Sequence, residues 1–395
     1  MLHSKLPAVG VSIFSQMTAL AQQTGALNLA QGFPDYDPPL PLREALARHA
    51  LAPGAHQYAP MPGLPRLRQA IAAQVARLQS DTPAPDPETE VTITSGATEA
   101  LYATLAAVVQ PGDEVLILEP AYDLYGPAVR LQGGVPRYVR LPAPHFQPDW
   151  AAVRAACSAR TKLFIINTPH NPSGAVFEAQ DWDELAVLAE ELDALVLADE
   201  VYAPLVFDGV APRSARQHPA LRARSLVLAS FGKTYHATGW KVGYCLASPA
   251  LTTELRRVHQ FVTFAVSTPT QHALADVLAA DPTDAHWRGL ADFYQTKRDA
   301  FRAGLAGSGW QLLPVPGGYF QLAGYEAFSK ASDLAFAHEL ACDWGVAVVP
   351  VSAFYHDGFD PGLVRFCFAK EAATLAAATT RLQQHPNRSG VDYTK

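Results

Sequence analysis

One lysine, Lys233, stands in an apolar turn with several glycines, directly after the strand-like run 225–229. Partial burial, together with the second cation Lys241, is expected to lower the pKa of its amine and to favour the neutral form. A neutral amine can form a Schiff base with a carbonyl compound. The stretch 230–244 therefore predicts a cofactor that is held covalently by Lys233.

Two other motifs in the same stretch indicate different chemistry. Residues 232–234 (GKT) imitate the end of a P-loop, but the first glycine of that motif would fall at Val227, inside a strand, so we exclude it. Residues 230–233 (SFGK) fit the SxxK pattern of serine acyl-transfer enzymes, although the chain has no SDN or KTG partner. A serine acyl-transfer enzyme stays as a remote alternative.

Polar residues also follow three other apolar runs. The segment 95–100 (SGATEA) opens a helix whose backbone N–H groups could hold a phosphate, with an ordinary helix cap as the alternative. Paired prolines in 167–174 form a rigid loop that directs Asn171 over the strand ends, unless the loop is a plain turn. Asp199 ends a buried run and needs a cationic or N–H partner, such as a pyridinium nitrogen or a neighbouring helix.

Strand-like runs alternate with helical windows between residues 91 and 248. The runs are 91–94, 114–118, 162–167, 195–198, 225–229 and 242–247. This alternation predicts an α/β fold with a mostly parallel sheet covered on both faces, and ligands are expected at the carboxyl ends of its strands.

The rest of the chain predicts two further parts. Residues 1–40 read as an N-terminal arm, irregular after a short helix, that belongs to a smaller lobe. Residues 41–270 form a large cofactor-binding domain, and 271–395 form a small α+β domain. In that last part we expect helices at 271–280, 287–304 and 375–382 and strands near 318–322, 346–349 and 364–368.

Composition narrows the class of protein. The chain has 395 residues, 49% of them hydrophobic, and its net charge of −7 and scattered basic residues argue against a nucleic-acid partner. The four cysteines show no CxxC spacing, so we expect core thiols, with neither a disulfide framework nor a metal site. No secretory leader or membrane-length apolar run is recognised, which predicts a cytoplasmic protein without a membrane partner.

With these motifs placed, the chain resembles the fold-type I, class I and II aminotransferases, which use pyridoxal 5′-phosphate. The ordered markers of the family are NLAQGFPD at 28–35, Tyr58, SGATEA at 95–100, NPSG at 171–174, DEVY at 199–202, SFGK at 230–233, GWKVG at 239–243 and Arg365. Within the family the chain is most similar to the kynurenine aminotransferase subgroup, and there to the bacterial methionine aminotransferases.

The resemblance implies a role for each matching residue around the cofactor. Lys233 would bind it covalently and, once released by the substrate amine, would move the proton as base and acid. Asp199 would keep the pyridine nitrogen protonated, and Asn171 and Tyr202 would hydrogen-bond the ring oxygen. The other implied cofactor contacts are Gly96, Ala97, Thr98, Ser230 and Lys241 around the phosphate, Tyr122 stacked on the ring, and Tyr58 from the second subunit of a homodimer.

For the substrate, the resemblance implies that Arg365 binds the α-carboxylate as a bidentate pair, with Asn171 and a backbone contact from Gly32. Phe14, Tyr122 and Phe264 are candidates for an apolar pocket, with Phe264 supplied by the partner subunit. No further arginine is evident for a distal carboxylate. Ala265 departs from the histidine of the kynurenine enzymes, which argues against kynurenine itself.

The function predicted in this way is a ping-pong transfer of the amino group of a neutral amino acid to a 2-oxo acid. The expected donors are methionine or an aromatic amino acid such as phenylalanine, tyrosine or kynurenine. The nearest alternative is a cysteine-S-conjugate β-lyase that works at the same site. A cofactor-dependent regulatory protein is disfavoured, because no DNA-binding segment is recognised before residue 28 and the chain has no basic helix.

Overall fold

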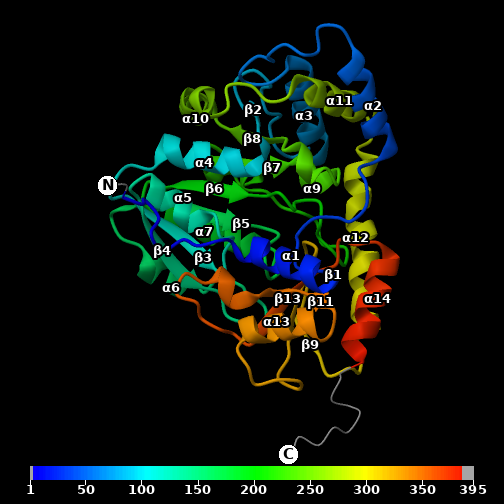
Figure 1. Cartoon of the computed structure of the whole chain (residues 1–395). Coiled ribbons are helices and arrows are strands. Elements are labelled where there is room, and N and C mark those ends of the chain that lie inside the picture. The colour runs from blue at the N-terminus through cyan, green and yellow to red at the C-terminus, as the bar shows by residue number, and fades with distance from the viewer. Residues whose placement is uncertain (1–2, 385–395) are drawn as a thin grey trace, which may run out of the picture.

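Seven strands form the central sheet in the computed structural model, which describes residues 3–384 (Figure 1). They are β2 (Val91–Thr94), β3 (Glu114–Glu119), β4 (Val135–Arg140), β5 (Thr161–Asn167), β6 (Leu195–Asp199), β7 (Ser225–Ser230) and β8 (Gly243–Ala247). Their order is β2-β8-β7-β6-β5-β3-β4. Strand β8 runs in the direction opposite to the other strands of this sheet. The prediction of a mostly parallel sheet is confirmed, although the half-exposed edge strand β4 was missed.

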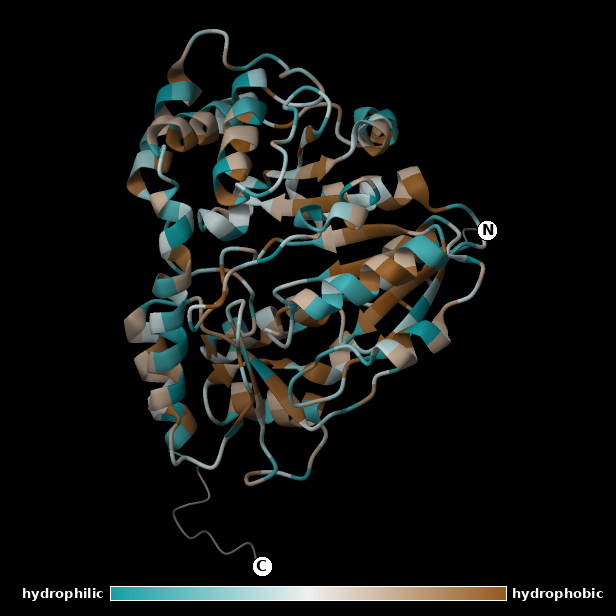
Figure 2. Ribbon diagram, turned by 180° about the vertical axis from the view of Figure 1, so that it is seen from behind, coloured by the Kyte–Doolittle hydropathy of each residue, from teal (hydrophilic) through white to brown (hydrophobic). Residues whose placement is uncertain are grey.

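Both faces of this sheet are covered, which explains why its strands are continuous apolar runs rather than alternating ones. In β3, Val115 and Ile117 pack on one side, with α4 (Gly96–Val108), α5 (Tyr125–Leu131) and α10 (Pro249–Val262). Leu116 and Leu118 pack on the other side, which is covered by α2 (Leu40–Leu51), α3 (Pro65–Leu78), α7 (Ala179–Glu191) and α11 (Thr268–Ala280). The hydrophobic strands accordingly lie between helices that turn polar faces outward (Figure 2).

A second core gathers the rest of the chain around two small sheets. One sheet is antiparallel, with the order β12 (Val349–Pro350), β13 (Leu363–Cys367), β10 (Phe320–Gly324), β9 (Gln311–Leu312). The other pairs β1 (Leu27–Asn28) with β11 (Val346–Ala347) in parallel. The helices that contribute to this core are α1 (Ile13–Thr24), α12 (Ala285–Gly304), α13 (Asp333–Cys342) and α14 (Ala372–Gln383).

The N-terminal arm is more ordered than its sequence suggested. Leu29 and Ala30 are fully buried, and the Leu29 carbonyl accepts a hydrogen bond of 2.8 Å from the Cys367 amide. The arm is therefore an edge of the second core, and the expectation of an irregular segment is wrong here. Helix α2 was also missed, since the prolines at its start read as a turn, although proline is tolerated in the first turn of a helix.

The predicted domain boundary at residue 270 divides a packed unit. Helix α11 contributes Ala273, Leu274 and Leu278 to the core of the large sheet, whereas α12 contributes Leu290 and Phe301 to the second core. We therefore propose that the large domain extends through α11 and that α12, the long helix along one side in Figure 1, begins the small domain. The last part of the predicted small domain, 385–395, lies outside the described residues.

The cysteines differ in their surroundings. Cys245 and Cys367 are buried, Cys157 is half-buried and Cys342 is exposed. The prediction of core thiols is thus wrong for Cys342, and none of the four forms a disulfide in the described part of the chain. As for membranes, no helix among residues 3–384 has both the length and the apolar character needed to span a bilayer.

Replacing Gly243 by alanine is expected to destabilise the protein. A Cβ atom at Gly243, the first residue of β8, would lie 2.5 Å from the Ala229 carbonyl oxygen and 3.0 Å from the Ala97 amide nitrogen. Such overpacking costs about 1–3 kcal/mol, so the midpoint of thermal unfolding should fall. Gly289→Ala is the matched control, because a Cβ there meets nothing within 4 Å and lies in a helix. Equal midpoints for the two variants would contradict this packing argument.

Candidate active site

A pocket of about 470 Å³ opens at the carboxyl ends of the central strands, between the large sheet and the arm. The residues that the sequence singled out and that line it are Phe14, Gly32, Gly96, Ala97, Thr98, Tyr122, Asn171, Asp199, Tyr202, Ser230, Lys233, Lys241 and Arg365. They come from segments more than 350 residues apart in the chain. Tyr58 and Phe264 do not line it.

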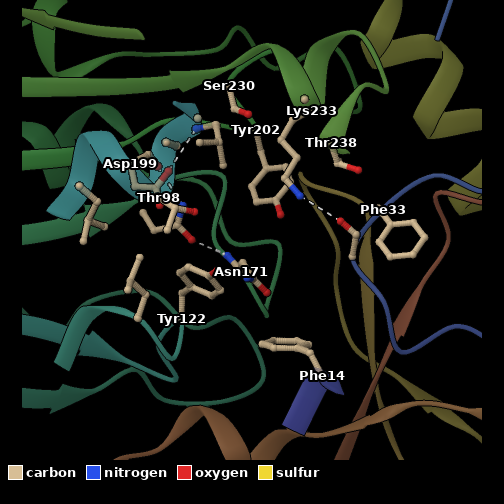
Figure 3. A pocket seen from close by; sticks show the side chains of 18 of the residues that line it. Phe14, Phe33, Thr98, Tyr122, Asn171, Asp199, Tyr202, Ser230, Lys233 and Thr238 are labelled. Atoms are coloured by element: carbon tan, nitrogen blue, oxygen red, sulfur yellow. Dashed lines mark hydrogen bonds between the residues drawn. The ribbon is translucent and has the colours of Figure 1, made fainter. Parts of the chain in front are cut away.

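Lys233 lies in the one-turn helix α9 (Phe231–Thr234) that follows β7, and its side chain points into the pocket (Figure 3). Its Nζ donates hydrogen bonds of 2.9 Å to the Gly32 carbonyl and to the Tyr319 hydroxyl. The pKa of the amine is lowered to about 8, mainly by burial and in part by the nearby cations Arg365 and Lys241, although Cys367 and Asp199 act in the opposite direction. At pH 7 an amine with this pKa is neutral in about one molecule in ten, far more often than an ordinary lysine.

Asp199 ends β6 on the opposite side of the same space (Figure 3). Its carboxylate accepts a hydrogen bond of 2.7 Å from the Tyr125 hydroxyl and a longer one of 3.4 Å from the Val201 amide. Both donors are neutral, and burial raises the pKa of the carboxyl. A buried carboxylate with neutral partners is well placed to receive a protonated ring nitrogen.

The loop after β5 is fixed to the end of β6 by a side chain that the sequence did not single out. Asn167 donates to the Asp199 carbonyl over 2.8 Å and accepts from the Asn171 amide over 2.7 Å. The Asn171 side chain then accepts a hydrogen bond of 2.7 Å from Arg365. The loop therefore joins the aspartate at one end of the pocket to the arginine at the other.

Arg365, in β13, is 1% exposed and sits among aromatic rings, with the Phe320 ring centre 4.0 Å from its guanidinium carbon. Besides Asn171 it donates to the Ala30 carbonyl over 2.8 Å, and its buried Nε has no hydrogen-bond partner among the described residues. Burial lowers the pKa to about 10, so the group stays charged at neutral pH. A buried cation whose protein partners are neutral is a site for an anion such as a carboxylate.

The amino-terminal turn of α4 forms another wall. Its cap residue, Ser95, makes no side-chain capping bond, so the backbone N–H groups at Ala97 and Thr98 keep their capacity to bind an anion. The Lys241 ammonium lies 3.4 Å from the Thr98 hydroxyl, and Ser230 lines the same wall. This donor set fits a phosphate group.

Aromatic side chains enclose the remaining side of the pocket. The Phe14 ring lies 6.5 Å from Tyr122 and 5.9 Å from Phe354, measured between ring centres. Phe33, which the sequence did not single out, also lines the pocket. This side is suited to an apolar substrate side chain.

Tyr58 and Phe264 lie together elsewhere on the surface. Their ring centres are 5.2 Å apart, and the side chains are 82% and 50% exposed. Phe261 and Val262 are exposed beside Phe264, at the end of α10. A single chain thus leaves these residues as an apolar surface.

Three residues whose side chains hydrogen-bond to the site residues were missed: Tyr125, Asn167 and Tyr319. Asn167 ends a predicted strand, so its position at the sheet edge was a usable signal. Tyr125 follows Tyr122 by three residues, which is close to one helical turn. This spacing was a weaker signal than the position of Asn167. Tyr319 comes from the second core, and nothing in its spacing from Lys233 could indicate contact.

The chain is similar to known proteins in both sequence and structure. The sequence model of the family "Aminotransferase class I and II" matches residues 24–382. Methionine aminotransferase of Escherichia coli strain K12 is 48% identical, covering 97% of this chain and 98% of that protein. The solved structure of YbdL from Escherichia coli, reported with a methionine aminotransferase function, has a TM-score of 0.94 at 48% identity, with 97% and 99% coverage.

Two further relatives extend the comparison. The probable N-succinyldiaminopimelate aminotransferase DapC of Mycobacterium tuberculosis is 37% identical, covering 97% of this chain and 98% of its own length. A kynurenine–oxoglutarate transaminase of Dictyostelium discoideum is 31% identical, covering 94% of each chain. The expected fold and the resemblance stated from the sequence are confirmed by these matches.

The depressed pKa of Lys233 predicts a selective reactivity of the cofactor-free protein. Acetylation of Lys233 should rise with pH around a midpoint near 8, because only the neutral amine reacts and it forms above that pKa. An ordinary lysine has a pKa of about 10.4. Peptide mass spectrometry after brief acetylation between pH 6 and 11 gives the midpoint, with the exposed Lys5 as internal reference. A Lys233 midpoint above about 10 would contradict the predicted effect of burial.

Proposed function

Since the chain belongs to the class I and II aminotransferases, we propose that it transfers the amino group of methionine or an aromatic amino acid to a 2-oxo acid. The observation that carries this proposal is Arg365, a buried cation at the edge of an aromatic pocket. The only other cations that line the pocket in the described chain are Lys233 and Lys241. One carboxylate and one uncharged side chain therefore suit the site.

We further propose pyridoxal 5′-phosphate as the cofactor, because the donor set fits its parts. The turn at Thr98, with Ser230 and Lys241, suits the phosphate, and Asp199 suits the ring nitrogen. When bound, this cofactor supplies an electron-accepting ring that stabilises negative charge at the substrate Cα. The remaining residues proposed to hold it are Gly96, Ala97, Tyr122, Asn171 and Tyr202, with Lys233 as the covalent anchor.

The chain's own residues then divide the chemistry. Arg365 binds and orients the substrate carboxylate, and Phe14 covers the side chain. Lys233 takes the proton from the substrate Cα as a base and later gives up a proton as an acid, a task suited to an amine with a pKa of about 8. The arm around Gly32 lines the site and would limit the access of water to it. Two such half-reactions, with the amino donor and then with the acceptor, give ping-pong kinetics.

Two alternative functions are supported to different degrees. The SxxK acyl-transfer reading requires Lys233 to act on Ser230, yet the amine donates to Gly32 and Tyr319 instead, and the family match disfavours it. A β-lyase uses the same groups and differs only in the substrate bond that breaks. Product analysis distinguishes it, since a lyase yields pyruvate and a thiol whereas a transaminase yields a 2-oxo acid that keeps its sulfur.

The test is a spectroscopic titration of the purified holoenzyme. Methionine should bleach the absorbance of the bound cofactor, and a 2-oxo acid should restore it. Arg365→Lys should lower kcat/KM for methionine roughly thirtyfold or more, because loss of a buried, hydrogen-bonded charge pair costs about 2–5 kcal/mol. Lys233→Ala is the inactive control.

Two results would count against the proposal. Faster turnover of aspartate than of methionine would show that the pocket accepts a distal carboxylate. Wild-type rates in Lys233→Ala would refute the assigned base.

We also propose a homodimer with shared sites, because Tyr58 and Phe264 form part of an exposed apolar surface with Phe261. A second copy of the chain would cover this surface and bring both side chains to the neighbouring pocket. Monomeric protein would expose it to water at a cost of about 25 cal/mol per Å².

The dimer proposal predicts a particle of twice 42.5 kDa in sedimentation equilibrium. Phe261→Asp should shift it towards the monomer and weaken cofactor retention, because a charge is introduced where Phe261 is 86% exposed in the single chain. Leu334→Asp, at another exposed apolar position, should do neither. A monomeric wild-type protein with full activity would sink the proposal.

A further inference from the structure

Tyr319, directly before β10, contacts the reactive amine from the small domain. Its side chain is fully buried. Its hydroxyl donates a hydrogen bond of 2.6 Å to the Gly32 carbonyl and accepts one of 2.9 Å from Lys233 Nζ. Since Lys233 also donates to Gly32 over 2.9 Å, the three polar groups form a closed triangle.

This triangle fixes the direction of the amine. A neutral amine has two N–H bonds and one lone pair at tetrahedral positions, and here both N–H bonds have acceptors. Both acceptors lie outside the loop that carries Lys233, one on the arm and one on the small domain. The lone pair is therefore left for the space of the pocket.

The neighbouring residue acts on the other end of the pocket. The ring of Phe320 lies 4.0 Å from the guanidinium carbon of Arg365, and a Cβ atom at Gly32 would lie 3.0 Å from its Cζ. Two consecutive residues thus contact the amine and the carboxylate-binding cation. A displacement of this strand would move both contacts relative to the central sheet.

Tyr319 itself does not exchange protons in the working range. Burial raises the pKa of its hydroxyl well above the ordinary value of 10. It therefore remains a neutral donor to Gly32 while it accepts from the amine. Tyr319 therefore contributes by holding the Lys233 amine in place and not by transferring a proton.

We propose that Tyr319 is a positioning residue that holds the released amine of Lys233 against the arm, so that its lone pair faces the substrate Cα. The inference rests on the proposed function. In the step concerned, the Cα–H bond breaks, its proton forms a new N–H bond at the Lys233 lone pair, and the electron pair of the broken bond is left on the substrate, where the electron-accepting cofactor would stabilise it. No oxidant or reductant is consumed.

The test compares Tyr319→Phe with Tyr325→Phe. Tyr325 follows the same strand, is buried, and donates to the Ala331 carbonyl over 2.9 Å, away from Lys233. Stopped-flow absorbance of the holoenzyme mixed with ordinary and Cα-deuterated methionine gives the rate and isotope effect of the half-reaction. Tyr319→Phe should slow it at least about tenfold and raise the isotope effect, because misplacement of a catalytic group costs up to about 10² in rate. The concentration for half-saturation should change less than about twofold.

A second readout uses the cofactor-free protein. The hydroxyl accepts a hydrogen bond that the charged amine also makes, so its removal should shift the acetylation midpoint of Lys233 to lower pH. The other titratable groups that act on this amine are Cys367, Arg365, Asp199 and Lys241, and they are unchanged in the variant. Tyr325→Phe should leave the midpoint where it is in the wild type.

The outcomes separate the two proposals. If Tyr319→Phe keeps the wild-type rate, isotope effect and acetylation midpoint, the positioning role is refuted while the proposed function stands. If the wild-type holoenzyme does not react with any neutral amino acid, the proposed function fails. The acetylation midpoint then still decides whether Tyr319 holds the amine.

Discussion

The site depends on one buried cation that has no carboxylate partner in the described chain. Arg365 is held by the carbonyl of Ala30 and the amide oxygen of Asn171, so the small domain, the arm and the large-domain loop meet at its guanidinium. Neutral acceptors satisfy its N–H groups only in part and leave its charge uncompensated. This makes the protein receptive to an anion at the point where its three parts converge.

Burial acts with opposite sign on the other two ionisable groups of the pocket. It lowers the pKa of the Lys233 amine and raises the pKa of the Asp199 carboxyl, because each charged form loses hydration. The amine becomes a usable base near neutral pH. The carboxylate becomes dependent on a cationic or N–H partner. One apolar environment therefore shifts both pKa values in the directions that suit the roles proposed for the two groups.

Much of the fold was accessible from the sequence, because strands buried on both faces are continuous apolar runs and their carboxyl ends share one edge. Asp199, Asn171 and Lys233 could be placed at that edge for this reason. Other elements could not be placed from the sequence, because their positions depend on packing. Helix α2 was missed because its initial prolines are typical of a turn. Helix α11 packs against α2 and α3, a contact that its sequence did not indicate. Residue type alone does not show which neighbour covers an apolar face.

The sequence by itself determined the chemistry: a lysine, an aspartate and an arginine in apolar surroundings, in the order typical of an aminotransferase. Only the tertiary structure decided how these groups are held. Tyr125 on Asp199 and Tyr319 on Lys233 belong to contacts between segments up to 86 residues apart. Hydrogen bonds between distant segments depend on how the elements pack, and linear spacing does not record that packing. Lys233 could be identified from the sequence, whereas its hydrogen bonds to Gly32 and Tyr319 could not.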